Sequence, residues 1–191
     1  MLNSEDIDLA TQYFLGNTEP LLKESERFSR LFLTYITDNN SSTLRELVTL
    51  NLLGYKSYDE KHGADGIDIN TNRIKEVKPK FLRLGQKLGS SGNFNDMTLS
   101  LLEKKKDFDI ICSLFSYDRL IYLIEFPLSV IYDKLRKPID NAVKGKRVVC
   151  HFTFKDYDND LLKVYYFDKE LAEERKCLSK THISMLESRV I

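Results

Sequence analysis

The segment GADGIDINTNRIKEVKPK, residues 63–80, holds the side chains best suited to chemistry. Short β-branched runs on either side of an Asn-rich turn predict a β-hairpin. Along a strand, side chains two residues apart share a face, so Glu76 and Lys78 project together. Val77 points the other way, into packing. The hairpin therefore carries a carboxylate and an ammonium group side by side.

A second carboxylate joins this pair from the first strand of the hairpin. With a turn of two or four residues centred on residues 71–72, Asp65 lies opposite Lys78. Asp65, Glu76 and Lys78 then share one face. An odd-length turn or a bulge reverses the parity and brings Asp68 to that face. The pattern favours Asp65, with Asp68 as the competing residue.

This trio suits the hydrolysis of a phosphodiester. Two neighbouring carboxylates form a hard-oxygen site for Mg²⁺, which takes few protein ligands and keeps several waters. The cation can neutralise the charge that develops on phosphorus and lower the pKa of a bound water. Lys78 could orient or deprotonate the attacking water, or stabilise the transition state as a cation.

The tripeptide alone carries little information. An acidic residue, any residue and Lys follow each other four times, at 59–61, 76–78, 103–105 and 174–176. Only the copy at 76–78 lies on an expected strand behind a partner strand that carries an Asp. The competing interpretation is an exposed hairpin whose charges only solvate it.

Helices are expected on either side of an Asn- and Ser-rich break at 38–42. Apolar residues at near-helical spacing predict an amphipathic helix over 19–37. Thr43, with Glu46 three residues later, is a capping-box pattern that opens a second helix, and Gly54 closes it. Residues 1–42 thus form an N-terminal helical segment.

Residues 79–97 are expected to form one long irregular segment, and loops of this length are usually functional or mobile. A short helix over 98–106 follows and ends in the three lysines 104–106. We interpret these lysines as a solvated helix end favoured by the helix dipole, in preference to a DNA clamp.

The rest of the chain alternates between strands and helices. Apolar runs at 108–115 and 120–126 predict buried strands. Three further elements are expected after them: a helix over 129–137 that stops at Pro138, a hairpin over 147–154 and 161–167, and a helix over 169–178. This order predicts an α/β fold with a mixed central sheet flanked by helices.

Composition and charge narrow the class of protein. The 191 residues, 42% of them hydrophobic and 30% charged, suit a single domain with a proper core. The net charge is zero, but residues 73–106 carry 9 basic and 3 acidic side chains. A basic block inside a neutral protein could face an anionic polymer, and it could equally be solvated surface.

Several classes of protein and site are disfavoured. Three Cys without a CxxC pair, and three His without HExxH or HxH spacing, argue against zinc and against His-metal nucleases. No basic n-region precedes an apolar run and no apolar stretch approaches roughly 20 residues, so neither a signal peptide nor a membrane span is expected. The odd number of Cys suits a reducing compartment, and we expect a cytoplasmic location.

Residues 43–155 resemble the PD-(D/E)xK nuclease superfamily. The resemblance rests on a helix with an inward Glu in RELV, a Gly-Ala-Asp strand, a strand that contains Glu-Val-Lys, and the strands and helix that follow. The small size and the NFND loop after the Lys are most similar to type II restriction endonucleases. The residue before Asp65 is Ala64, where the family has Pro.

The resemblance implies a role for each residue of the motif. Asp65 and Glu76 would be ligands of Mg²⁺, with the Val77 carbonyl as a third. Lys78 would be the catalytic lysine, and Glu46 an outer acidic member of the site. Glu46 keeps its second interpretation, as the capping-box partner at the start of its helix.

Candidates for DNA contact lie just beyond the trio. Asn can make paired hydrogen bonds to adenine in the major groove, and Gly-rich loops approach phosphates closely. Asn93 and Asn95 are therefore candidates, beside Lys80, Arg83 and Lys87. The alternative is a mobile linker with no contact to DNA.

The expected activity is that of a type II site-specific deoxyribonuclease, which needs Mg²⁺ and cleaves double-stranded DNA. The alternatives are a repair or recombination nuclease of the same fold and a nucleic-acid-binding module without catalysis. One trio cuts one strand, so a double-strand break requires a second site. A homodimer would supply it through the helix at 19–37 or the C-terminal segment 156–191, and a larger partner subunit is the alternative.

Overall fold

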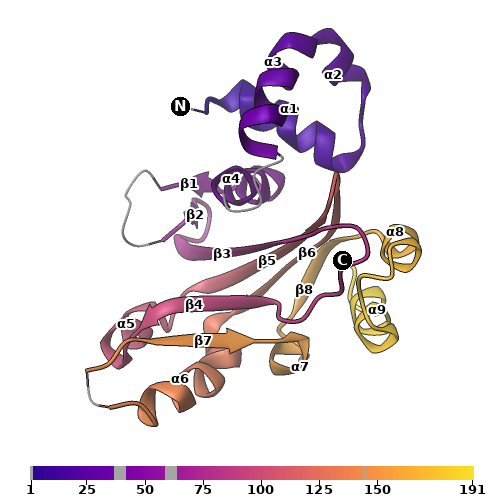
Figure 1. Cartoon of the computed structure of the whole chain (residues 1–191). Helices are drawn as coiled ribbons and strands as arrows, with labels where there is room; N and C mark the ends of the chain where they lie inside the picture. The colour runs from indigo at the N-terminus through magenta and orange to yellow at the C-terminus, as the bar shows by residue number, and fades with distance from the viewer. Residues whose placement is uncertain (1, 37–41, 59–63, 144) are drawn as a thin grey trace.

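A group of helices opens the chain in the computed structural model, which describes residues 2–36, 42–58, 64–143 and 145–191 (Figure 1). Its members are α1 (Ser4–Leu15), α2 (Glu19–Lys23), α3 (Ser25–Leu31) and the π-helix η1 (Phe32–Ile36). No helix is predicted before residue 19, so α1 is an addition. The single helix expected over 19–37 is wrong, because the backbone leaves the helical region at Glu24, with φ −112° and ψ 37°. Residue 37 and the expected break at 38–41 lie outside the described residues.

Helix α4 (Thr43–Leu52) begins at the predicted residue but without the predicted capping box. Ser42 precedes its first turn and makes no side-chain capping bond, so Thr43 already lies inside the helix. The chain turns at Gly54, whose φ of +67° lies in the left-handed region that glycine adopts readily. The predicted helix is therefore confirmed and its capping box is wrong.

A mixed sheet of six strands occupies the centre of the described structure, in the order β1-β2-β3-β5-β6-β8. The strands are β1 (Lys56–Ser57), β2 (Gly66–Asp68), β3 (Arg73–Leu82), β5 (Asp109–Ser116), β6 (Arg119–Pro127) and β8 (Lys163–Phe167). β3 and β5 are parallel, and the other neighbouring pairs are antiparallel. The predicted class, α/β with a mixed central sheet flanked by helices, is confirmed.

A separate two-stranded ribbon pairs β4 (Gly92–Met97) with β7 (Val148–Phe152). The expected irregular segment at 79–97 is therefore wrong at both ends, because β3 continues to Leu82 and β4 begins at Gly92. The second hairpin, expected over 147–154 and 161–167, is also wrong. Helix α7 (Phe154–Tyr157) follows β7 and starts with a capping box between Thr153 and Asp156. The next strand, β8, pairs with β6 and not with β7.

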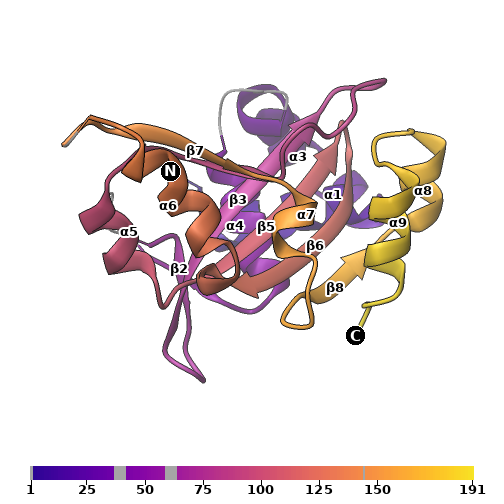
Figure 2. The same ribbon diagram turned by 90° about the horizontal axis from the view of Figure 1, so that it is seen from below.

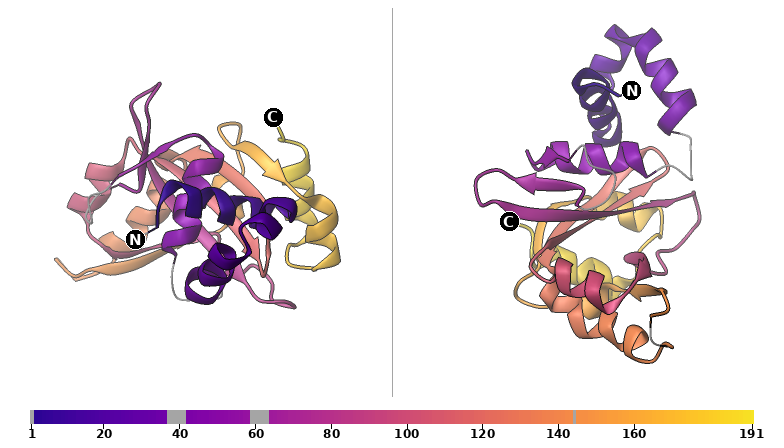
Figure 3. Two further views of the ribbon diagram at one scale, coloured as in Figure 1. Left: turned by 90° about the horizontal axis from the view of Figure 1, so that it is seen from above. Right: turned by 90° about the vertical axis from the view of Figure 1, so that its left-hand side faces the viewer.

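Helices cover both faces of the central sheet, as the right-hand view of Figure 3 shows. One apolar core lies beneath the N-terminal helices and includes Phe14, Val48, Val77, Ile111 and Phe115. The second core lies on the opposite face, where α6 (Tyr132–Asp140) and β7 stand in front of the sheet in Figure 2, and includes Phe94, Ile110, Leu114, Phe126 and Phe152. Because strand side chains alternate, Val77 belongs to the first core and Glu76 faces the second.

The remaining helices flank the second core. They are α5 (Leu99–Lys105), the 3₁₀ helix η2 (Leu128–Ile131), α6 (Tyr132–Asp140), α8 (Lys169–Glu174) and α9 (Lys180–Glu187). The expected stop at Pro138 is wrong, because α6 continues through it for two residues. The expected helix at 169–178 ends at Glu174, and α9 is an addition. Within the described ranges, no helix is both long and apolar enough to cross a membrane.

Candidate active site

The β2–β3 hairpin turns over residues 69–72. Each residue of β2 therefore pairs with a β3 residue two positions earlier in the sequence than expected. Asp68 shapes the turn, since its carboxylate accepts hydrogen bonds from the Asn70 backbone N–H at 2.9 Å and the Thr71 hydroxyl at 2.7 Å. Asn72 adopts a positive φ of 56°. Asp68 therefore serves the turn, and these hydrogen bonds lower its pKa.

The register places Asp65 next to Glu76. Gly66 lies opposite Lys75, so the predicted pairing of Asp65 with Lys78 is wrong. The shift is two residues, and because side chains alternate with period two, it leaves every side chain on its predicted face. Asp65 and Glu76 thus come together by a different pairing from the one expected.

The Asp65 carboxylate lies at the end of the β2–β3 ladder and continues it. Its Oδ2 accepts a hydrogen bond from the Val77 backbone N–H at 2.6 Å. Burial, followed by the charge of Glu76, raises the pKa of Asp65 to about 6, against the opposing effects of the Val77 hydrogen bond and Lys78. Asp65 is thus a partly buried carboxyl group beside a second one.

Glu76 is buried, with 7% of the residue exposed, so the interpretation of a solvated hairpin is wrong for this residue. Lys78 Nζ lies 2.6 Å from its Oε1, and Lys105 Nζ lies 2.5 Å from its Oε2. Burial acts to raise the pKa of Glu76, but the two ammonium groups outweigh it and hold the pKa below its ordinary value. Glu76 therefore stays ionised at neutral pH.

Glu46 lies on α4, the helix that packs against β3, and is partly exposed. Its charge contributes to the raised pKa of Asp65. With the capping box absent, the competing interpretation of Glu46 loses its basis. The charges of Glu46, Glu76 and Lys78 therefore all act on Asp65, and Lys78 also acts on Glu76.

Lys78 begins a polar row that runs from β3 onto β4. Its ammonium group lies 4.6 Å from the centre of the Phe94 ring, at the start of the ribbon. Two residues further, Lys80 donates to Asn93 Oδ1 at 3.1 Å, and Asn93 donates to Asn95 Oδ1 at 3.0 Å. Lys80, Asn93 and Asn95, all predicted DNA contacts, thus form one hydrogen-bonded chain.

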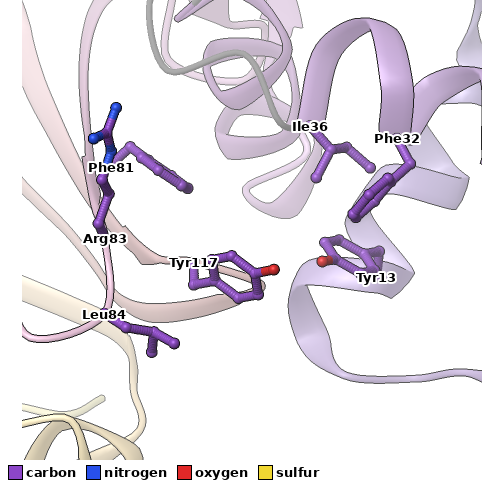
Figure 4. A pocket seen from close by; sticks show the side chains of 7 residues that line it. All are labelled: Tyr13, Phe32, Ile36, Phe81, Arg83, Leu84 and Tyr117. Carbon is purple, nitrogen blue, oxygen red and sulfur yellow. The ribbon is translucent and has the colours of Figure 1, made fainter.

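Arg83 and Lys87 are exposed in the loop after β3 and do not join this row. Arg83 instead lines a cavity of about 330 Å³ between the N-terminal helices and the end of β3, with Tyr13, Phe32, Ile36, Phe81, Leu84 and Tyr117. In Figure 4 the rings of Tyr13 and Tyr117 point toward each other, and the Arg83 guanidinium points away from both. The five predicted contacts therefore fall into two separate groups.

Lys105 is the residue that the sequence interpretation missed. Among the lysines 104–106, Lys104 and Lys106 are exposed as expected, but Lys105 is buried, with 8% of the residue exposed. The helical period gave a usable signal, because Lys105 lies three and four residues after Leu102 and Leu101, on the apolar side of α5. A lysine in that phase faces the core and needs a carboxylate partner there.

The donor set at this site is two carboxylates, Asp65 and Glu76, with the Val77 backbone. No group of three or more His, Cys, Asp and Glu side chains placed to hold a metal occurs in the part of the chain that the structure describes. In comparisons with known proteins, no family model matches this chain and no curated protein matches it.

Proposed function

We propose that this protein is a divalent-cation-dependent endonuclease that hydrolyses phosphodiester bonds of double-stranded DNA at a specific sequence. The observation that carries the proposal is the arrangement of two buried or partly buried carboxyl groups, Asp65 and Glu76, beside Lys78, where β2 meets β3. This is the residue set that the resemblance to PD-(D/E)xK nucleases implies for metal-dependent hydrolysis.

The donor set fits Mg²⁺. The pKa of Asp65 is raised first by burial and then by repulsion from Glu76, and a divalent cation held by these residues would relieve that repulsion. Mg²⁺ is commonly held by one or two carboxylates together with waters and substrate phosphate. Asp65, Glu76 and the Val77 carbonyl would hold the ion, which when bound supplies charge neutralisation at the phosphate.

Lys78 would stabilise the charge that develops in the transition state. Hydrolysis adds water across one P–O bond and leaves a phosphomonoester on one fragment and a hydroxyl on the other. Negative charge grows on the phosphoryl oxygens during this step, and a fixed ammonium group nearby stabilises it. Lys78 is fixed by Glu76 and by the Phe94 ring, so its charge is already in place before substrate binds.

Cleavage assays with matched variants test the proposal. Wild-type protein with Mg²⁺ and plasmid DNA should produce discrete fragments, and EDTA should abolish them. Asp65→Asn, Glu76→Gln and Lys78→Met should each reduce cleavage at least about 100-fold, the range expected when a group that stabilises the transition state is removed. Asp68→Asn, which alters only the turn, is the control and should retain cleavage. Activity that persists in Glu76→Gln or Lys78→Met contradicts the assignment.

The choice of DNA distinguishes the remaining functions. Cleavage confined to branched or junction DNA would indicate a repair or recombination nuclease. Binding without cleavage across a wide range of conditions would indicate a nucleic-acid-binding module.

Assembly follows from the need for two cuts. We infer a homodimer that places one site on each strand of a palindromic target, with a larger partner subunit as the alternative. Light scattering with and without cognate DNA separates the two. A chain that stays monomeric on DNA, or that only nicks one strand, contradicts the homodimer.

A further inference from the structure

Glu76 is held by two lysines that come from different elements. Lys78 follows it by two residues on β3, and Lys105 is the last residue of α5. Each ammonium group takes one carboxylate oxygen, Lys78 Nζ to Oε1 at 2.6 Å and Lys105 Nζ to Oε2 at 2.5 Å. The three side chains are at most 19% exposed. The resemblance to nucleases accounts for Lys78 and leaves Lys105 without a role.

We propose that Lys105 is a positioning residue that acts as the built-in counterion of Glu76, keeping divalent-cation affinity low until a DNA phosphate is also present. This inference rests on the proposed function. It concerns how the cation and the DNA are bound together and adds no chemical step.

The net charge of the site determines how strongly a cation binds there without DNA. With all five groups ionised, Glu46, Asp65, Glu76, Lys78 and Lys105 sum to −1, so a divalent cation entering alone leaves the site with an excess of one positive charge. Such an excess is unfavourable in a partly buried position. A phosphate brings compensating negative charge, so each ligand strengthens the binding of the other.

The surroundings of Lys105 keep its charge in place. Its ammonium group lies 5.0 Å from the centre of the Phe108 ring, which is itself 9% exposed. Its stem lies on the apolar side of α5 with Leu102. A buried ammonium group loses hydration and is retained only where a carboxylate compensates for it. Lys105 is therefore fixed on Glu76, unlike the exposed lysines on either side of it in the sequence.

Calcium binding tests the inference without any measurement of cleavage. Isothermal titration calorimetry of the whole chain with Ca²⁺, without DNA, compares wild type with Lys105→Met. Loss of a like charge this close to a cation site should tighten Ca²⁺ binding about tenfold, by analogy with pKa shifts of 1–3 units caused by neighbouring charges. Lys104→Met and Lys106→Met remove the same charge from exposed neighbours and should stay within about twofold of wild type.

A second arm measures the coupling to DNA. A short mixed-sequence duplex should tighten Ca²⁺ binding to wild type, and this gain should shrink in Lys105→Met. Lys105→Arg keeps the charge and should restore wild-type behaviour. If Lys105→Met fails to fold by circular dichroism, Lys105→Gln replaces it in the comparison with Lys105→Arg.

The outcomes are separable. Ca²⁺ binding that depends on Glu76, as shown by its loss in Glu76→Gln, but that is unchanged or weaker in Lys105→Met overturns the role of Lys105 alone. Ca²⁺ binding to wild type that Glu76→Gln leaves unaffected contradicts the proposed metal site, and the role of Lys105 with it.

Discussion

The Asp65 carboxylate accepts the Val77 backbone N–H at 2.6 Å, so a side chain takes the place that a backbone carbonyl would have in a continuing ladder. Asp65 precedes β2, and this bond joins it to the residue between Glu76 and Lys78. The position of Asp65 is thereby fixed relative to both. The same placement removes the carboxyl group from water beside another negative charge, which raises its pKa to about 6.

This raised pKa predicts a pH-dependent stability in the absence of metal. Because the folded-state pKa of Asp65 rises from 3.8 to about 6, its protonated form favours the folded state. That contribution is complete below about pH 4 and is lost as the pH rises through about 6. At about 1.4 kcal/mol per pKa unit, Asp65→Asn should be more stable than wild type by up to about 3 kcal/mol at pH 8. Asn also keeps an acceptor for the Val77 N–H.

Urea unfolding in EDTA at several pH values measures this difference. Asp68→Asn is the matched comparison with the opposite sign. Hydrogen bonds, led by that from Thr71, lower the pKa of Asp68, so its ionised form stabilises the fold and its loss should destabilise the protein at neutral pH. Equal stability of Asp65→Asn and wild type at pH 8 would contradict the electrostatic description of Asp65.

Gly92 predicts a steric link between the ribbon and Lys78. A Cβ at Gly92 would lie 2.3 Å from Phe152 Cζ and 3.2 Å from Lys78 Cβ. Phe152 is fully buried, so its ring has no room to withdraw. Gly92→Ala should therefore destabilise the protein by about 1–3 kcal/mol, as overpacking does, and should displace Lys78.

Gly89→Ala is the control for this substitution, because a Cβ at Gly89 would meet nothing within 4 Å. Chemical denaturation should show Gly89→Ala close to wild type and Gly92→Ala clearly weaker. Similar stability of the two variants would mean that the ribbon moves freely over β3.

Lys75 lies on the face of β3 opposite to Glu76 and Lys78. Replacing it should have a large effect on stability that is unrelated to the proposed site. Its ammonium group contacts Asp109 Oδ2 at 2.9 Å and Glu125 Oε1 at 3.2 Å, with 2% of the side chain exposed. Lys75→Met would leave two buried carboxylates short of positive charge, at a cost of about 3–5 kcal/mol. Lys56→Met, at an exposed position on β1, should change stability little when both are measured by thermal unfolding. A small effect at Lys75 would show that Arg73, which also binds Asp109, suffices.

The central sheet was predictable because its strands carry local signals. β5 and β6 are mostly apolar runs, and the β2–β3 hairpin has an Asn-rich turn between β-branched residues. The β4–β7 ribbon was not predictable in the same way. Its strands lie more than 50 residues apart, and only contacts such as Phe94 with Phe152 select this pairing over a local hairpin.

In the candidate site too, some features follow from local sequence patterns and others depend on tertiary contacts. The faces of Asp65 and Glu76 follow from alternation, which tolerates a two-residue error in register. The choice between Asp65 and Asp68 depended on the hydrogen bonds of Asp68 within the turn, which composition does not reveal. Lys105 reaches Glu76 only because the tertiary structure brings the end of α5 to this residue of β3, although its place on the apolar side of α5 could have been read from the helical period.

Under the proposed function, the row formed by Lys80, Asn93 and Asn95 predicts how DNA binding would divide between affinity and sequence preference. Lys80 is half-buried and donates to Asn93, while Asn95 lies at the exposed end of the row. A lysine on a phosphate adds affinity for any sequence, so Lys80→Met should weaken binding uniformly and reduce the slope of log affinity against log salt by about 1. An amide on a base edge adds discrimination, so Asn95→Ala should lose about 1–3 kcal/mol of preference for the cognate site.

Fluorescence anisotropy in EDTA at several salt concentrations, with cognate and scrambled duplexes, separates the two effects. Lys180→Met, an exposed lysine on α9, is the charge-matched control and should keep the wild-type salt slope. If Lys80→Met and Lys180→Met behave alike, the row makes no contact with phosphate. If Asn95→Ala weakens cognate and scrambled DNA equally, Asn95 contacts the backbone and sequence is read elsewhere.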